Sequence, residues 1–258
     1  MNNKNQYTQC AYCDGATCYP RVKLNDPLPS IEKAPPACPM RQHEEIIRQG
    51  ATQYQRANIQ EFARQASIQE SQCYEWTGDE LKTRIPRIEE IMQFAAKCHY
   101  TTLGLAFCIG LRKEARQISR IFEAKGFDVA SVCCKVGRTP KESIGLTGEE
   151  KSRGPEAMES MCNPIVQAEL LNDQNVDLAV MLGLCVGHDT LFLKYCRVPC
   201  TILAVKDRVL GHNPLAAIYL SESPYYGRLK KSAKGERPEG GWKKVDIMTE
   251  DENGEAGT

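Results

Sequence analysis

The sequence predicts an α/β protein: a small parallel, Rossmann-like sheet with flanking helices, preceded by a helical region and a cysteine-rich, metal-binding N-terminal arm. Three observations predict this fold. From residue 101 onward, four short apolar runs alternate with helical patterns, as in strand–helix–strand units. The residues before them carry helical periodicity only. The first forty residues combine cysteines and prolines without any sustained periodicity.

The arm, residues 1–40, is interrupted by prolines at positions 20, 27, 29, 35, 36 and 39. Each proline lacks an N–H and fixes φ, so regular helix is excluded across much of the arm. A segment this short cannot bury a core of its own, and it needs a metal or a surface to hold it.

Residues 41–220 are predicted to form the α/β domain, with a helical part at 41–99 and a βαβ part at 100–220. In the helical part, 42–74 reads as one or two helices with a break near Gly50, and Arg87–Cys98 reads as another, with Pro86 suited to its first turn. The predicted strands are Thr101–Cys108, Phe127–Cys133, Val176–Leu184 and Cys200–Val205. The predicted helices between and after them are Arg112–Lys125, Pro164–Leu171, Thr190–Tyr195 and one from Pro214. Residues 221–258 read as a polar, mobile tail with few anchoring side chains, among them Trp242.

Composition narrows the class of function. The 258 residues include 33 basic and 33 acidic side chains, so no net charge attracts nucleic acid or a membrane surface. The N-terminus lacks the apolar stretch of a signal peptide, and no apolar run approaches the ~20 residues that span a bilayer. We therefore expect a cytoplasmic protein with no nucleic-acid or membrane partner. Thiols stay reduced there, so thirteen cysteines favour metal binding or redox chemistry over disulfides.

The arm carries a metal-site spacing. Cys10, Cys13 and Cys18 form C-x2-C-x4-C, and Cys38 supplies a fourth thiol. Two thiolates on one tight turn, with a third and a fourth, complete a tetrahedron around zinc. A [4Fe–4S] cluster accepts similarly close cysteines. Zinc ranks narrowly first at this site.

A second cysteine set is predicted at the carboxyl edge of the sheet. Cys108, Cys133 or Cys134, and Cys185 follow three of the strands, and the carboxyl ends of parallel strands share one edge, where ligands bind. Cys162 joins them because Asn163–Pro164 reads as a helix start, and a helix N-terminus stabilises thiolate. Since side chains alternate along a strand, we expect only one of the adjacent pair to bind, with Cys134 favoured. The other thiols, Cys73, Cys98, Cys196 and Cys200, are interpreted as structural because they lie within predicted elements.

Polar side chains accompany this edge. His188, Lys206 and His212 are candidates for handling protons, and Arg208 for anchoring an anion. Asp189 and Asn213 are expected to cap helices. The glycine-rich loop from Lys135 to Pro155 is a candidate lid. No phosphate-binding loop, dinucleotide fingerprint or nucleophile elbow occurs in the sequence.

These motifs resemble the domain-of-unknown-function 1847 family (DUF1847), described as probable metal-binding proteins. The matching segments are CAYCDGATCYP, GLAFCIGLRKEA, SVCCK, MCNPIVQAELLN, GLCVGHDTLFLK and VKDRVLGHNP. The resemblance implies a metal-binding role and supplies no substrate.

Three hypotheses follow. In the first, the set Cys108, Cys134, Cys162 and Cys185 holds an iron–sulfur cluster in a redox or sulfur-transfer enzyme, with three of them as ligands and one iron left open. In the second, the same thiols store, deliver or sense a soft metal without catalysis. In the third, the zinc of the arm is structural and the edge binds a small anionic or sulfur-containing ligand. The visible colour and metal content of an anaerobic preparation discriminate between cluster and zinc.

Overall fold

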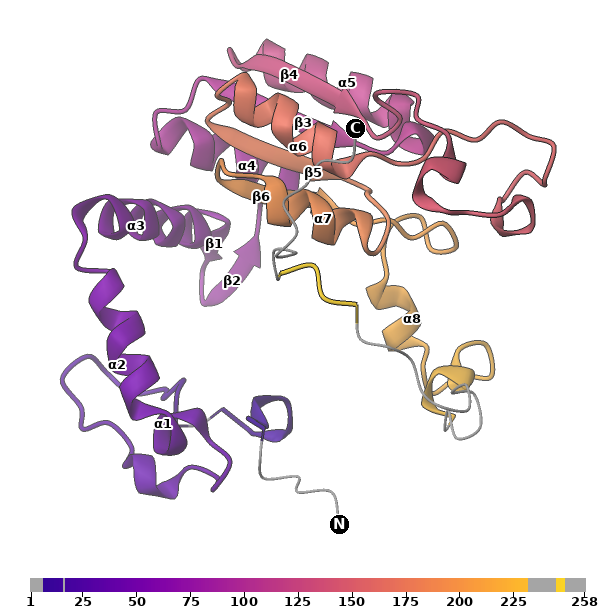
Figure 1. Cartoon of the computed structure of the whole chain (residues 1–258). Helices are drawn as coiled ribbons and strands as arrows, with labels where there is room; N and C mark the ends of the chain where they lie inside the picture. The colour runs from indigo at the N-terminus through magenta and orange to yellow at the C-terminus, as the bar shows by residue number, and fades with distance from the viewer. Residues whose placement is uncertain (1–6, 16, 232–244, 249–258) are drawn as a thin grey trace. The chain divides into compact units, whose positions relative to one another are not determined.

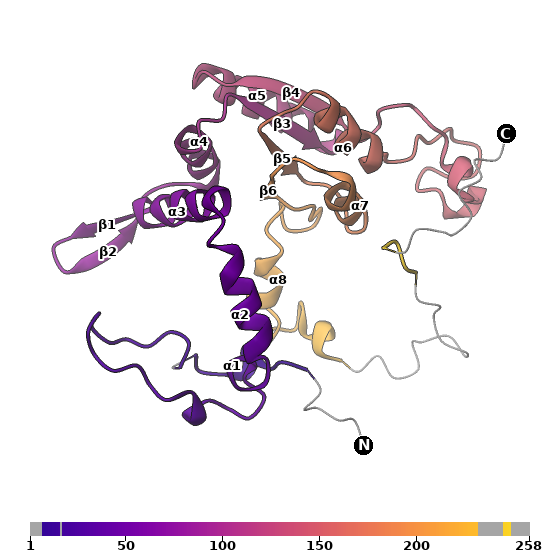
Figure 2. The ribbon, with the colours of Figure 1, turned by 60° about the vertical axis from the view of Figure 1, so that its left-hand side comes forward.

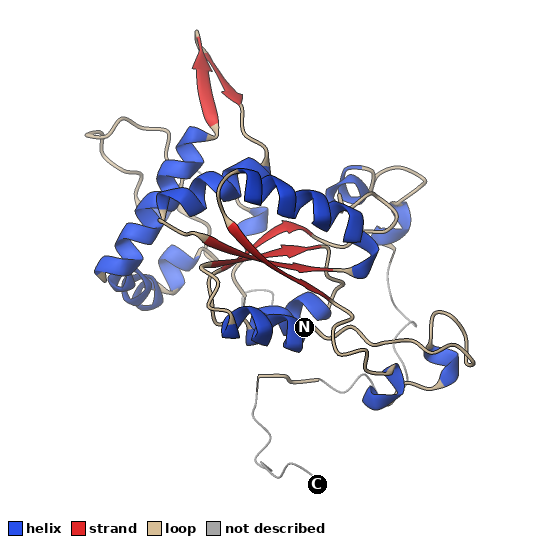
Figure 3. Ribbon diagram, turned by 90° about the horizontal axis from the view of Figure 1, so that it is seen from above, coloured by secondary structure: helices blue, strands red, loops and turns tan. Residues whose placement is uncertain are grey.

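The computed structural model describes residues 7–15, 17–231 and 245–248. Its largest sheet has four strands in the order β4-β3-β5-β6: β4 is Asp128–Cys133, β3 Thr102–Phe107, β5 Leu178–Leu182 and β6 Cys200–Ala204. The strands are parallel, and helices flank the sheet (Figures 1 and 3). The predicted mixed α/β class is therefore confirmed, as are the four strands to within two residues at each end.

Burial along the strands follows their place in the sheet. The four interior residues of β3 and all five of β5 are buried, because these two strands are central. The edge strands β4 and β6 are largely half-exposed. An apolar run with both faces covered is what a central strand in a parallel sheet requires.

The helices begin and end close to their predicted bounds. The longer ones are α2 Glu44–Gln53, α3 Ala57–Gln72, α4 Arg87–Lys97, α5 Arg112–Ala124, α6 Pro164–Asp173 and α7 His188–Tyr195; the shorter α1 and α8 are Pro39–Gln42 and Leu215–Tyr219. The break predicted near Gly50 is wrong. Gly50 lies inside α2, and the interruption comes at residues 54–56. An exposed helical glycine costs only about 1 kcal/mol relative to alanine, so it does not have to end a helix.

A hairpin was not anticipated from the sequence. The strands β1 Tyr74–Thr77 and β2 Glu80–Thr83 pair antiparallel, and Figure 2 shows them extending beyond the end of α3. Their two-residue connection is Gly78–Asp79, and Gly78 has φ of +65°. A glycine at the first turn position between two short β-prone runs is a hairpin signal.

The described chain forms two compact units. Among the described residues, one unit comprises those up to Gly104, Gln117–Ala130 and Asn175–Leu178, and the other comprises Leu105–Arg116, Ser131–Gln174 and those from Ala179 onward. The division runs through the strands, so the carboxyl ends of β3, β4 and β5 and the loops that follow them belong to the second unit. The boundaries predicted at residues 40 and 220 remain predictions. Most of the tail, including Trp242, lies outside the described residues.

Within the second unit, Gln167 of α6 ties the ends of two strands together. Its side chain is fully buried, and its Nε2 donates to the backbone oxygens of Val132 at 2.7 Å and Phe107 at 3.3 Å. These two residues directly precede the Cys133–Cys134 pair and Cys108. The bonds therefore hold the strand ends that carry the edge cysteines.

Candidate metal centre

Three thiols from three separate loops meet after the strand ends. Cys108 follows β3, Cys134 follows β4, and Cys162 precedes α6. The sulfur atoms of Cys134 and Cys162 lie 3.9 Å apart, and the thiols of Cys134 and Cys108 hydrogen-bond to each other. We call Cys108, Cys134 and Cys162 the thiol cluster. The structure thus brings together three of the four cysteines predicted for this edge.

Backbone hydrogen bonds fix the positions of these residues. The N–H of Cys108 donates to the oxygen of Leu182 at 3.1 Å, and that of Cys134 donates to Phe107 at 2.8 Å. The N–H of Asn163 donates in turn to the oxygen of Cys134 at 2.8 Å. Cys108 and Cys134 are therefore each held by the neighbouring strand, and the start of α6, next to Cys162, is bonded to Cys134. The predicted cap is confirmed, because the Asn163 side chain accepts from the Val166 N–H and Pro164 is the first residue of α6.

Donors and cations surround the sulfur atoms. The Ile109 N–H lies 3.3 Å from Cys134 Sγ, and Lys135 Nζ lies 3.4 Å from Cys162 Sγ. Lys206 hydrogen-bonds to Cys108. The cluster therefore contains three thiols beside two ammonium groups, which is an environment that stabilises thiolate.

The three thiols of the cluster differ in pKa. Hydrogen bonding from Cys134 lowers the pKa of Cys162 to about 3, with His188 and Lys135 adding to the effect, and lowers that of Cys108 to about 5. The same two bonds, with burial, raise the pKa of Cys134. The outer two thiols, Cys108 and Cys162, are therefore the more acidic members of the cluster, and Cys134 is the least acidic.

Cys185, in the loop after β5, and His188, the first residue of α7, complete this edge. His188 hydrogen-bonds to Cys162, which raises the pKa of the imidazole, while its Nδ1 atom is buried with no partner among the described residues. Cys185 Sγ accepts from Arg208 Nη2 at 3.0 Å, and this bond raises the pKa of the guanidinium. Cys185 thus shares the edge with the thiol cluster but pairs with an arginine.

One cavity of about 790 Å³ joins these groups. Its lining contains the four predicted cysteines together with His188, Lys206, Arg208 and His212. The loop predicted as a lid contributes further lining side chains, namely Lys135, Lys141, Ile144, Leu146 and Ser152. Lys141 Nζ bonds to the buried Glu159 at 2.6 Å, and this bond is the main reason that the pKa of Glu159 falls to about 2. The loop is therefore an ordered wall of the cavity.

The structure distinguishes between neighbouring residues of the predicted site. Cys133 is the last residue of β4 and does not line the cavity, as the alternation of side chains along a strand requires. The caps predicted at Asp189 and Asn213 are wrong: Gly187 precedes α7, which places Asp189 in its first turn, and Pro214 precedes α8. His212, at φ of +68°, uses its Nδ1 to accept from the Asp207 N–H at 3.1 Å.

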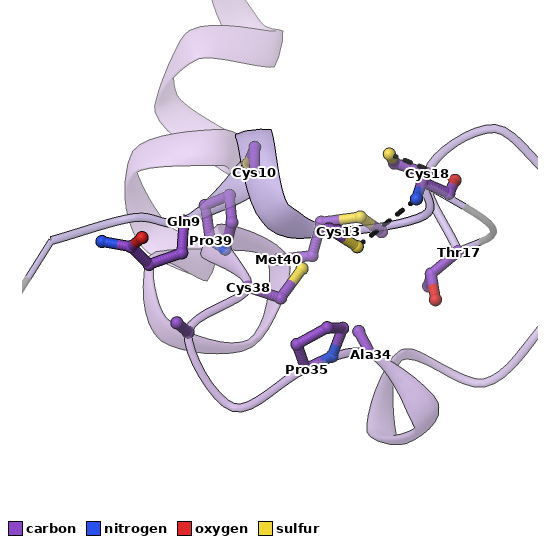
Figure 4. A pocket seen from close by; sticks show the side chains of 12 residues that line it. Gln9, Cys10, Cys13, Thr17, Cys18, Ala34, Pro35, Cys38, Pro39 and Met40 are labelled. Atoms are coloured by element: carbon purple, nitrogen blue, oxygen red, sulfur yellow. Dashed lines mark hydrogen bonds between the residues drawn. The ribbon is translucent and has the colours of Figure 1, made fainter. Parts of the chain in front are cut away.

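The cysteines of the arm share a second, smaller cavity in the other unit. Cys10, Cys13, Cys18 and Cys38 all line a space of about 90 Å³, shown in Figure 4. They come from the single turn Cys10–Tyr12, the loop after it, and the residue before α1. The Gly15 N–H donates to Cys13 Sγ at 3.4 Å. The ligand role of these four residues stays a prediction.

In the described part of the chain, no three histidine, cysteine, aspartate or glutamate side chains form a group that could hold a metal ion as they stand. Over the same residues, no helix combines the length and apolar character needed to cross a bilayer.

Comparison with known proteins places the chain in a family. Residues 38–203 match the family described as "Protein of unknown function (DUF1847)". An uncharacterized protein of Methanocaldococcus jannaschii is 40% identical over 177 residues, which cover 69% of this chain and 86% of that protein. No solved structure matches.

The matched range contains Cys108, Cys134, Cys162 and Cys185 but begins at Cys38, so the first three cysteines of the arm lie outside it. The same holds for Lys206, Arg208 and His212 at the other end. Over its central 38–203 segment, this chain belongs to the DUF1847 family.

Proposed function

We propose that this protein binds a metal centre through Cys108, Cys134 and Cys162, with Cys185 as the fourth cysteine of the site, and that an iron–sulfur cluster is the favoured occupant. One observation carries the proposal: three thiols from three loops, distant in sequence, touch one another at one cavity. Buried cysteines acting as small apolar residues would not need two ammonium groups beside them.

The strand order supports a ligand site at this place. In chain order the four strands are arranged 2-1-3-4, as in doubly wound, Rossmann-like sheets, and the direction of winding reverses between β3 and β5. Cys108 follows the first of these two strands and Cys185 the second. Ligands of such sheets bind in the crevice beyond the strand ends at this reversal.

The charges suit an anionic thiolate centre. Lys135, Lys206 and Arg208 each contact a different cysteine sulfur, so they would offset the negative charge of a cluster and its thiolates. Cys185 is bound to Arg208, whereas the thiol cluster is not. This arrangement supports three cysteine ligands and one open position.

An open iron would supply Lewis-acid or sulfur-accepting chemistry to a redox or sulfur-transfer reaction. The side chains that line the cavity would then bind the substrate and supply protons to it. His188, beside Cys162, holds a proton close to the cavity, and Lys206 holds another beside Cys108. His212 lines the same space. The cavity, at about 790 Å³, has room for a small anionic or sulfur-containing molecule in addition to a metal centre.

A second candidate is a single tetrahedral ion held for storage, delivery or sensing. With zinc–sulfur bonds of about 2.3 Å, two thiolates on one tetrahedral zinc lie about 3.8 Å apart. The sulfur atoms of Cys134 and Cys162 are separated by 3.9 Å, which fits this spacing. For the arm, we propose zinc bound by Cys10, Cys13, Cys18 and Cys38, with an iron–sulfur cluster as the alternative.

Metal and acid-labile sulfide analysis of the anaerobically purified full chain tests the proposal. We expect a brown protein with broad visible absorption, iron and sulfide at cluster stoichiometry, and about one zinc per chain from the arm. A colourless protein with two zinc ions per chain would contradict the cluster and favour the second candidate, a single tetrahedral ion at the sheet edge. A chain with no bound metal after anaerobic reconstitution with iron, sulfide and zinc would refute both.

A further inference from the structure

Cys196 and Cys200 form a thiol pair of their own, away from the proposed metal centre. Cys196 directly follows α7, and Cys200 is the first residue of β6. Their side chains hydrogen-bond to each other, and both residues are half-buried. Because the metal-site cysteines follow the carboxyl ends of the strands, this pair lies at the amino end of β6. The sequence predicts a structural role for both thiols and does not predict their contact.

The loop that carries the pair is held in place by α6. The buried side chain of Asn172 donates to the oxygen of Tyr195 at 2.8 Å and accepts from the N–H of Arg197 at 2.9 Å, so it brackets Cys196 on both sides. The guanidinium of Arg197 makes two contacts with Glu169, at 3.0 and 2.9 Å. Pro199, just before Cys200, restricts the loop further. The two thiols therefore face each other across a short, fixed turn.

We propose that Cys196 and Cys200 are a redox-active dithiol, which a small disulfide such as oxidised glutathione converts to an intramolecular disulfide. The two cysteines stand at the ends of a three-residue segment that hydrogen bonds from α6 hold in place, so their sulfurs stay close enough for a disulfide to form between them. Partial exposure gives a small disulfide access to the pair. The three residues between the cysteines make the closed ring small.

The reaction balances as a thiol–disulfide exchange. The Cys196 thiolate attacks one sulfur of the small disulfide, forms a mixed disulfide and releases one thiolate, which takes up a proton. Cys200 then gives up its proton and attacks the Cys196 sulfur, releasing the second small thiol. In total two protein thiols are oxidised and one small disulfide is reduced to two thiols. A small thiol in excess runs the same steps in reverse.

The roles of the two cysteines follow from their hydrogen bonds. The bond with Cys200 lowers the pKa of Cys196, and contacts with Val198 and Arg197 add to this effect. The same bond raises the pKa of Cys200, as does burial. Cys196 is therefore the attacking thiolate and Cys200 the resolving thiol.

Tryptic mapping tests the proposal directly. The full chain, purified anaerobically, is incubated in glutathione buffers of rising oxidised fraction, its free thiols are alkylated, and it is digested. Trypsin cleaves after Lys194, Arg197 and Lys206, so the disulfide links two peptides, 195–197 and 198–206, each with a single cysteine. We expect this linked pair to accumulate and to disappear with excess reduced glutathione.

Single variants separate the two steps. Cys200→Ser is expected to stop at a glutathione adduct on Cys196, and Cys196→Ser to slow adduct formation on Cys200 by about tenfold or more. Cys73 is the control, because it is half-exposed, is the single cysteine of peptide 65–82, and its sulfur donates to the Gln69 oxygen of its own helix. If Cys73 acquires glutathione under conditions that leave Cys196 and Cys200 as free thiols in the wild type, the proposal is wrong. Both variants are expected to keep the metal content of the wild type, so the outcome is independent of the proposed metal centre.

Discussion

Replacement of Cys134 by serine is expected to abolish metal binding at the sheet edge, whereas replacement of Cys133 is expected to leave it intact. The two residues are adjacent, yet only Cys134 is buried, touches both Cys108 and Cys162, and lines the cavity. Serine removes the soft ligand atom and changes the volume little. The loss of a ligand at a metal site costs several kcal/mol of binding energy, so occupancy should fall by more than about tenfold.

Metal and sulfide content of the two variants, purified in parallel with the wild type, measures this difference. Cys133→Ser is the matched control because it makes the same chemical change one residue earlier, at a half-exposed position. Equal metal loss in the two variants, or full retention in Cys134→Ser, would contradict the assignment of ligands. The zinc that we propose for the arm is expected to stay in both variants.

Gly183→Ala is expected to lower the free energy of unfolding by about 2–5 kcal/mol, the largest stability effect that we predict for a change of one methyl group. Gly183 follows β5 with φ of +63°, where an added Cβ is strained, and this Cβ would overlap the Cδ1 atom of Leu111. Leu111 is 6% exposed and cannot move without repacking the core. Its N–H donates to the Cys108 oxygen at 2.8 Å, so the displacement would also reach the thiol cluster.

Gly126→Ala is the matched control for this prediction. Gly126 has a similar φ of +88°, but no atom lies within 4 Å of an added Cβ. Only the backbone strain remains there, at about 1–2 kcal/mol. Urea unfolding under anaerobic, reducing conditions compares the two variants with the wild type. If the Gly183 variant loses no more stability than the Gly126 variant, the close approach of Leu111 does not constrain the edge.

The sequence predicts the strands and helices after residue 100 well, because the apolar runs of the strands and the cap signals of the helices are both strong there. Near-continuous apolar runs mark β3 and β5, and Asn163–Pro164 marks the start of α6 by a cap whose chemistry is local. The placement of Cys108 and Cys134 follows from the parallel sheet, since parallel strands end at one edge, and that of Cys162 follows from the helix start at Asn163–Pro164. Alternation of side chains predicts that only one of Cys133 and Cys134 lines the cavity, and in the structure it is Cys134.

What the sequence did not predict depends on side-chain contacts between distant elements. The hydrogen bonds of Gln167 and the contact of Lys135 with Cys162 depend on packing angles that no local pattern encodes. The hairpin β1–β2 is a different case, because its Gly78–Asp79 turn was readable. Helix starts at α7 and α8 shifted by one or two residues, since several residues there can serve as the cap.

An anomalous difference map from crystals of the anaerobically purified protein, recorded at the iron and zinc edges, tests the central proposal most directly. We expect a peak in the cavity after β3, β4 and β5, within bonding distance of the sulfur atoms of Cys108, Cys134 and Cys162, with the iron edge giving the signal. A map with no metal peak bonded to any of these three sulfurs would contradict the assignment of a metal centre to this edge.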